Sequence, residues 1–139
     1  MLSVNAGGQI PQSHELEFRV RYKETDAQGR VHHSNYANYF EMGRTELVRS
    51  SGFSYRDVEA AGVMLVVTNL KCEFFKGAQY DDLLKMKTTV LRAKGVRIVN
   101  QYEIFLDDEL IVRGETTVAA VDANGKVVRL PDFLQMKSR

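Results

Sequence analysis

The sequence predicts an α+β fold in which one long helix packs against a curved antiparallel sheet of about five strands. Three observations support this prediction. One segment has apolar residues at helical spacing, several segments alternate apolar and polar residues with period two, and most of these segments are joined by short turns, which favour antiparallel pairing. The chain has 139 residues, of which 44% are hydrophobic and 27% charged, so its size and composition fit one globular domain.

The first expected elements are a strand over Glu15–Tyr22, where apolar and charged residues alternate throughout, and a helix over residues 35–51. The helix is indicated by apolar or small residues at helical spacing: Tyr36, Tyr39, Phe40, Gly43 and Leu47. Ser34 or Asn35 is the expected N-cap, because either side chain can accept a hydrogen bond from an unpaired backbone N–H one turn later. Gly52 supplies a natural end to the helix.

A short second helix is expected over Ser54–Ala61, with serine at its head and Gly62 at its end. The remaining pattern indicates four strands joined mostly by tight turns, at residues 63–75, 83–92, 96–106 and 110–121. The dipeptide Asn124-Gly125 is a strong hairpin signal and predicts a final short strand near residues 127–130.

One helix cannot cover every face and edge of such a sheet. We therefore expect the chain to self-associate, through edge-to-edge pairing that continues the sheet, as a homodimer or as a homotetramer made of two dimers. The expected organisation is a flexible N-terminal tail over residues 1–13 followed by a single domain over residues 14–139.

Composition argues against several classes of function. A net charge of +1 gives no overall field that would steer the protein onto nucleic acid or anionic lipid. No apolar run approaches the roughly 20 residues that a membrane span needs. Cys72 is the only cysteine, which excludes an internal disulfide framework, and the first residues lack a secretion signal, so a cytoplasmic location is expected.

The segment between the first strand and the helix holds a candidate catalytic site. Asp26, the flexible Gly29 and His33 precede the predicted helix start. A carboxylate facing the exposed N–H groups of a helix start can attack a carbonyl, or activate water against it, while those N–H groups polarise the carbonyl oxygen. This pattern points to acyl transfer, and the sequence leaves both roles of Asp26 open, nucleophile and general base.

A longer motif contains this segment: Tyr22-x-x-x-Asp26-x-x-Gly29-x-Val31-x-His33-x-x-Tyr36-x-x-Tyr39-Phe40-Glu41-x-x-Arg44-x-Glu46. The motif resembles the signature of hotdog-fold acyl-CoA thioesterases of the 4-hydroxybenzoyl-CoA type, and most of all the Tol-Pal-associated branch. The resemblance covers about residues 15–134. The chain departs from the commonest pattern at His32, where an aromatic residue is frequent, and at Gln28, where small residues are common.

The resemblance implies a hotdog fold, with Asp26 as the catalytic carboxylate, the backbone N–H of His33 as the group that polarises the thioester oxygen, and Tyr22 as a third active-site residue. The His33 ring could also contact the substrate, but we favour the N–H role. Gly29, Ser34 and Asn69 are candidate substrate contacts. Cations near two turns could hold the phosphates of coenzyme A: Lys71 and Lys76, and the cluster Arg92, Lys94 and Arg97.

The expected activity is therefore hydrolysis of acyl-CoA thioesters by an enzyme without a metal ion or cofactor, coenzyme A being part of the substrate. The three histidines do not form a recognisable ligand cluster. Two alternatives remain: a non-catalytic acyl-CoA-binding or scaffold protein of the same fold, and a hotdog 3-hydroxyacyl dehydratase. Asp26 argues against both, because binding alone needs no carboxylate at the thioester and a dehydratase arranges its acid and histidine differently.

Overall fold

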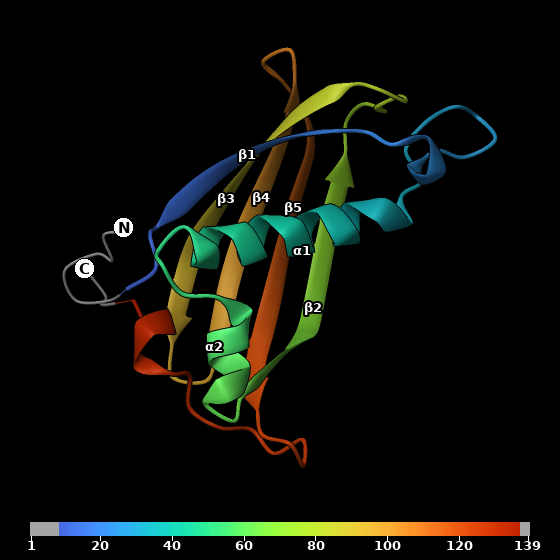
Figure 1. The fold of residues 1–139 in the computed structure, drawn as a ribbon. Coiled ribbons are helices and arrows are strands. Elements are labelled where there is room, and N and C mark those ends of the chain that lie inside the picture. Colours follow the sequence, from blue (N-terminus) through green and yellow to red (C-terminus); the bar gives the residue numbers. More distant parts are fainter. Residues whose placement is uncertain (1–8, 137–139) are drawn as a thin grey trace.

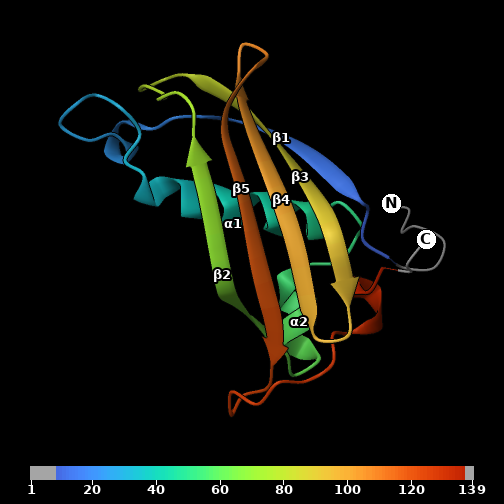
Figure 2. The same ribbon diagram turned by 180° about the vertical axis from the view of Figure 1, so that it is seen from behind.

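One antiparallel sheet and one long helix make up most of the molecule. The computed structural model describes residues 9–136, and its sheet has the strand order β1-β3-β4-β5-β2. The strands are β1 Ser13–Arg19, β2 Met64–Phe74, β3 Leu83–Lys94, β4 Arg97–Leu106 and β5 Glu109–Val121. Helix α1 (Ser34–Arg49) crosses one face of the sheet (Figure 1), and the view from behind shows the other face without a helix (Figure 2). The predicted fold class is confirmed.

A row of charged residues crosses the face of the sheet that points away from α1. Across its five strands, Glu15 lies opposite Lys87, Lys87 opposite Glu103, Glu103 opposite Arg113 and Arg113 opposite Glu73. Neighbouring residues in this row have opposite charges, and such cross-strand pairs stabilise a sheet modestly. Successive side chains along each strand point to opposite faces. One set therefore packs toward the helix, and the other includes this row of acidic and basic residues, which points toward solvent.

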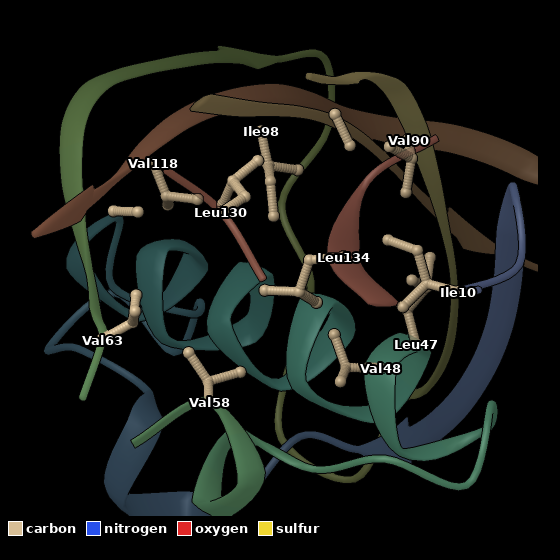
Figure 3. Packing of buried hydrophobic residues seen from close by; sticks show 12 residues of the cluster. Ile10, Leu47, Val48, Val58, Val63, Val90, Ile98, Val118, Leu130 and Leu134 are labelled. Atoms are coloured by element: carbon tan, nitrogen blue, oxygen red, sulfur yellow. The ribbon is translucent and has the colours of Figure 1, made fainter. Parts of the chain in front are cut away.

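The buried face forms two apolar clusters. The first joins the C-terminal part of α1 to the segment near the chain's end, and Figure 3 shows its members, among them Leu47, Val58 and Leu134. The second surrounds Phe40 and Tyr102, whose rings stack with centroids 4.4 Å apart. The ring of Phe40 lies directly over Gly114, a position where any side chain would overlap it.

A buried polar row separates the two clusters. Thr88, Asn100 and Thr116 lie on the helix-facing side of the three middle strands, and each is at most 4% exposed. The hydroxyls of Tyr102 and Thr116 share a hydrogen bond of 2.6 Å. The interior thus consists of two apolar halves that meet at hydrogen-bonding side chains rather than one continuous apolar core.

The long helix begins one residue earlier than expected and has a different cap. His33 is the N-cap, and its side chain makes no capping hydrogen bond, so the predicted Ser34 or Asn35 cap is wrong. Asn35 instead donates its side-chain N–H to the backbone oxygen of Glu24, 2.8 Å away. The side chain that could have capped the helix ties the preceding loop to it.

The short elements agree with the prediction only in part. Helix α2 spans Tyr55–Ala60, and Ser54 caps it in a reciprocal arrangement with Asp57. The expected strand near residues 127–130 does not form; only an isolated bridge joins Val127 to Val121. The chain then crosses to the β3–β4 turn, because Leu130 is buried in the first cluster.

The segment before β1 is partly folded into the domain. Residues 1–8 of the expected tail lie outside the described residues. Ile10 is 5% exposed and its N–H donates to the oxygen of Phe133, while the oxygen of Gln12 accepts from Val90. In the part of the chain from residue 9 to residue 136, no helix is both long enough and apolar enough to cross a membrane.

Candidate active site

Asp26 lies in a tight turn that holds its carboxylate by one oxygen. After the 3₁₀ turn at Tyr22–Glu24, the N–H groups of Gln28 and Arg30 donate to Oδ1 of Asp26 at 2.9 and 3.3 Å. The N–H of Asp26 donates to the oxygen of Arg30 at 2.8 Å, and Gly29 closes the turn with a φ of +79°, a conformation that favours glycine. No hydrogen bond among the described residues involves Oδ2, which leaves that oxygen available for substrate.

The helix start faces the same space as Asp26. Asp26 and His33 both line a hollow of about 360 Å³, which we call the Asp26 hollow. Its lining residues are Asp26, Gln28, Arg30, Val31, His33, Phe74, Phe75, Lys76 and Gly77. Among the described residues, the N–H of His33 makes no hydrogen bond, and it sits at the positive end of the α1 dipole. The structure therefore places Asp26 and the residue that caps α1 beside one cavity.

Glu24 anchors the base of this loop. Its side chain is buried, and Oε1 accepts from the backbone N–H of Arg21 at 2.8 Å and from the hydroxyl of Tyr39 at 2.9 Å. Its backbone oxygen accepts from the N–H of His32 at 2.9 Å and from the side chain of Asn35. Burial, and then the hydrogen bond to Glu24, raises the pKa of Tyr39, so its hydroxyl stays protonated and keeps donating. One residue thus links the end of β1, the loop and the helix.

Aromatic and thiol groups form a neutral wall next to the hollow. The ring of Tyr36 contacts the rings of Phe74 and Tyr39, with both centroid distances 5.5 Å. Burial raises the pKa of Tyr36 to about 12 and that of the Cys72 thiol to about 11. Both groups therefore stay uncharged near neutral pH, where they act in packing and not as acids or bases.

The other local candidates lie beside the hollow without lining it. Tyr22 is 78% exposed, and its ring packs edge-to-face on Tyr80 with centroids 5.7 Å apart. The hydroxyl of Ser34 is 2.8 Å from Nδ1 of His32. Gly29 acts through the turn that it allows. Of the three residues predicted to be catalytic, the structure brings Asp26 and His33 together and turns Tyr22 toward a neighbouring loop.

The more distant candidates lie elsewhere on the same chain. Asn69 and Lys71 are exposed on β2, opposite Thr117 and Glu115 of β5. The basic cluster Arg92, Lys94 and Arg97 surrounds the β3–β4 turn, which is at the opposite end of the sheet from the β2–β3 connection that contributes Phe75, Lys76 and Gly77 to the hollow (Figure 2). Within one chain, these basic residues do not join the Asp26 hollow.

Several lining residues were not among the predicted site residues. Gln28 and Arg30 belong to the same turn as Asp26, so their closeness in the sequence was a signal that could have identified them. Phe74, Phe75 and Gly77 come from the far side of the chain, and no local pattern connects them with Asp26. A bridge between Arg30 and Gln79 and a hydrogen bond from the N–H of Val31 to the oxygen of Ala78 bring this segment to the Asp26 turn.

A second turn in the chain has almost the same geometry as the Asp26 turn. Oδ1 of Asp122 accepts from the N–H groups of Asn124 and Lys126 at 2.9 and 3.0 Å, and its own N–H donates to the oxygen of Lys126 at 2.8 Å. Gly125 has a φ of +80°. This turn follows β5 and leads into extended chain, whereas the turn at Asp26 leads into a helix start. The turn alone is therefore a structural motif, and its position creates the candidate site.

Comparisons with known proteins identify related sequences and structures. A family model described as the thioesterase superfamily matches residues 28–112. The Escherichia coli acyl-CoA thioester hydrolase YbgC (strain CFT073) is 33% identical over 105 residues, which cover 75% of this chain and 78% of that protein. The DHNA-CoA thioesterase of Staphylococcus aureus has a similar structure, with a TM-score of 0.81, 35% identity, and coverage of 84% of this chain and 80% of that one. A probable thioesterase of Bartonella henselae has a TM-score of 0.81 and 32% identity, covering 86% and 99% of the two chains.

Proposed function

The chain belongs to the thioesterase superfamily, and from this premise we propose that it hydrolyses acyl-CoA thioesters to a free acid and coenzyme A. One observation supports the assignment of residues. The carboxylate of Asp26 is held through Oδ1, and Asp26 lines one cavity together with His33, the N-cap of α1. A thioester in that cavity would meet a carboxylate oxygen on one side and a positively polarised helix end on the other.

Two reaction routes use this carboxylate. In the first, Oδ2 of Asp26 attacks the carbonyl carbon, the C–S bond breaks, coenzyme A leaves as its thiolate, and water then hydrolyses the mixed anhydride. In the second, Asp26 takes a proton from water, whose oxygen attacks the carbonyl directly. In both, the N–H of His33 stabilises the negative charge that develops on the carbonyl oxygen. Incorporation of label into Asp26 during a single turnover in ¹⁸O-water would support the first route.

The test compares two aspartates in equivalent turns. Asp26→Asn keeps an oxygen that can accept from Gln28 and Arg30 but removes the charge, and we expect it to lower the rate of thiol release from a panel of acyl-CoA thioesters at least about 10²-fold. Asp122→Asn makes the same change in the matched turn and should leave the rate unchanged. Equal rates for wild type and Asp26→Asn would contradict the proposal, and a protein that binds acyl-CoA without releasing any thiol would be a binding protein.

We further propose that two chains pair through β2. This strand is at the edge of the sheet, and it exposes five large apolar side chains, each 39–54% accessible: Met64, Val66, Val67, Leu70 and Phe74. An exposed apolar edge strand favours pairing with another chain, and a tetramer would join two such dimers. Sedimentation should show a dimer or tetramer that Val67→Glu shifts toward monomer; a wild-type monomer would contradict the proposal.

A cytoplasmic location and the lack of a cofactor remain predictions.

A further inference from the structure

Arg30 is fixed next to Asp26 with its charge unpaired among the described residues. The backbone at Arg30 is held by the Asp26 turn on one side and by a bridge to Gln79 on the other. Its side chain lies across Gly77, where a Cβ added to the glycine would come within 2.8 Å of Cδ and 3.4 Å of Nε. The ion pairs within residues 9–136 do not include Arg30, although it is a full positive charge at every physiological pH.

A second hollow adjoins the first at this arginine. It has a volume of about 490 Å³ and is lined by Arg30, Phe75, Lys76, Gly77, Gln79, Asp82 and Leu106. Four of these residues, Arg30, Phe75, Lys76 and Gly77, also line the Asp26 hollow, so they form the wall between the two. The side chains of Arg30 and Lys76 therefore lie where the two hollows meet. A substrate that extended from one hollow into the other would pass both cations.

The two cations are not equivalent. Nζ of Lys76 is 3.1 Å from Oε1 of Glu109, and both side chains are more than half exposed, so part of the lysine's charge is already balanced. Asp82 also lines the second hollow, where its Oδ2 accepts from the N–H of Gln79 at 2.8 Å, and its carboxylate would repel an anion placed beside it. Arg30 is thus the main group on this wall that could bind an incoming anion, with Lys76 adding to the local positive charge.

We propose that Arg30, assisted by Lys76, binds an oxyanion group of the substrate while the thioester lies against Asp26. This inference rests on the proposed thioesterase function and adds a specificity determinant to it. The guanidinium offers paired N–H donors that match the two oxygens of a carboxylate or phosphate. It also offsets the repulsion that Asp26 would exert on an anionic substrate. The oxyanion is either a carboxylate on the acyl group or a phosphate of coenzyme A.

Four thioesters distinguish these sources. They are a neutral acyl group on coenzyme A, the same acyl group on N-acetylcysteamine, which has no phosphate, and a carboxylated acyl group on each of these two thiols. For each, kcat and KM are measured with wild type and with Arg30→Ala. Because a hydrogen bond to a charged group is typically a strong one, we expect Arg30→Ala to lower kcat/KM about 10- to 100-fold for thioesters that carry the bound oxyanion, mainly through KM.

The pattern of losses decides the result. Losses on both coenzyme A thioesters identify a phosphate, and losses on both carboxylated thioesters identify an acyl carboxylate. An equal loss on all four substrates would overturn the subsite, because a merely structural role would affect them alike. Turnover of the neutral N-acetylcysteamine thioester by wild type tests the thioesterase function separately, since that substrate carries no oxyanion.

Three further variants keep the proposal testable if the Arg30→Ala protein does not fold. Arg30→Lys keeps the charge and should restore part of the loss. Gly77→Ala keeps Arg30 but pushes its side chain away from the wall, and it should reproduce the same substrate pattern more weakly. Arg56→Ala removes an exposed arginine from α2, outside both hollows, and should change none of the four values. Wild-type behaviour of both Arg30→Lys and Arg30→Ala would contradict the proposal.

Discussion

Replacing Glu24 should destabilise the protein by an amount set by its hydrogen bonds. In Glu24→Ala, the N–H of Arg21 and the buried hydroxyl of Tyr39 both lose their acceptor. A buried donor without a partner costs about 1–3 kcal/mol. The Arg21 side chain is 64% exposed, so water can reach this region. Loss of the acceptor for the backbone N–H of Arg21 should therefore cost about 1 kcal/mol, the lower limit of this range. We therefore expect a loss of about 2–4 kcal/mol in the free energy of unfolding.

Glu24→Gln is the matched control. Its amide oxygen can still accept both hydrogen bonds that Oε1 receives, and only the contact of Oε2 with Nε of Arg21, at 3.3 Å, becomes unfavourable. Because that arginine is mostly exposed, we expect a cost of about 1 kcal/mol or less. Urea unfolding at one fixed protein concentration gives both values. If Glu24→Ala and Glu24→Gln unfold at the same urea concentration, the hydrogen bonds of Oε1 do not stabilise the loop and the reasoning is wrong.

Three other predictions follow from packing and burial. Gly114→Ala would place a methyl group against the tip of the Phe40 ring, which stacks on Tyr102, so the free energy of unfolding should fall by about 1–3 kcal/mol. A change within experimental error would show that the ring can move. Because burial raises the pKa of Cys72 to about 11, iodoacetamide at pH 8 should label native protein far more slowly than urea-unfolded protein, and equal rates would contradict this. Burial also raises the pKa of Tyr36 to about 12, so above pH 10 the unfolded chain loses this proton first and stability falls as pH rises; Tyr36→Phe should make that fall shallower.

The sequence was most informative where a pattern is local. Period-two alternation located all five strands of the sheet, helical spacing located α1, and the serine before α2 and Gly62 after it located α2, each to within a few residues. The family resemblance and the hotdog fold are confirmed by the matching family and by structures such as the S. aureus thioesterase. The strand predicted over Glu15–Tyr22 ends at Arg19 instead, because the chain must turn there so that Glu24 can be buried under the loop.

Prediction failed where tertiary packing overrode a local signal. Asn124-Gly125 suggested a hairpin with a strand at residues 127–130, but only an isolated bridge forms at Val127, and Leu130 is buried in the first apolar cluster. The wall of the Asp26 hollow includes Phe74 and Gly77, whose position depends on strand order, which a single sequence does not specify. The two equivalent turns at Asp26 and Asp122 show the same limit, since only their surroundings tell them apart.

The polar row of Thr88, Asn100 and Thr116 has a consequence for how the molecule opens. Because it divides the interior, the half around Phe40 and the half around Leu134 need not lose their packing in one cooperative event. Amide protons in the half that supports the Asp26 loop can then exchange with solvent through a partial opening that leaves the other half closed. The mobility needed for substrate entry and product release would then be confined to the half of the molecule that contains the Asp26 loop.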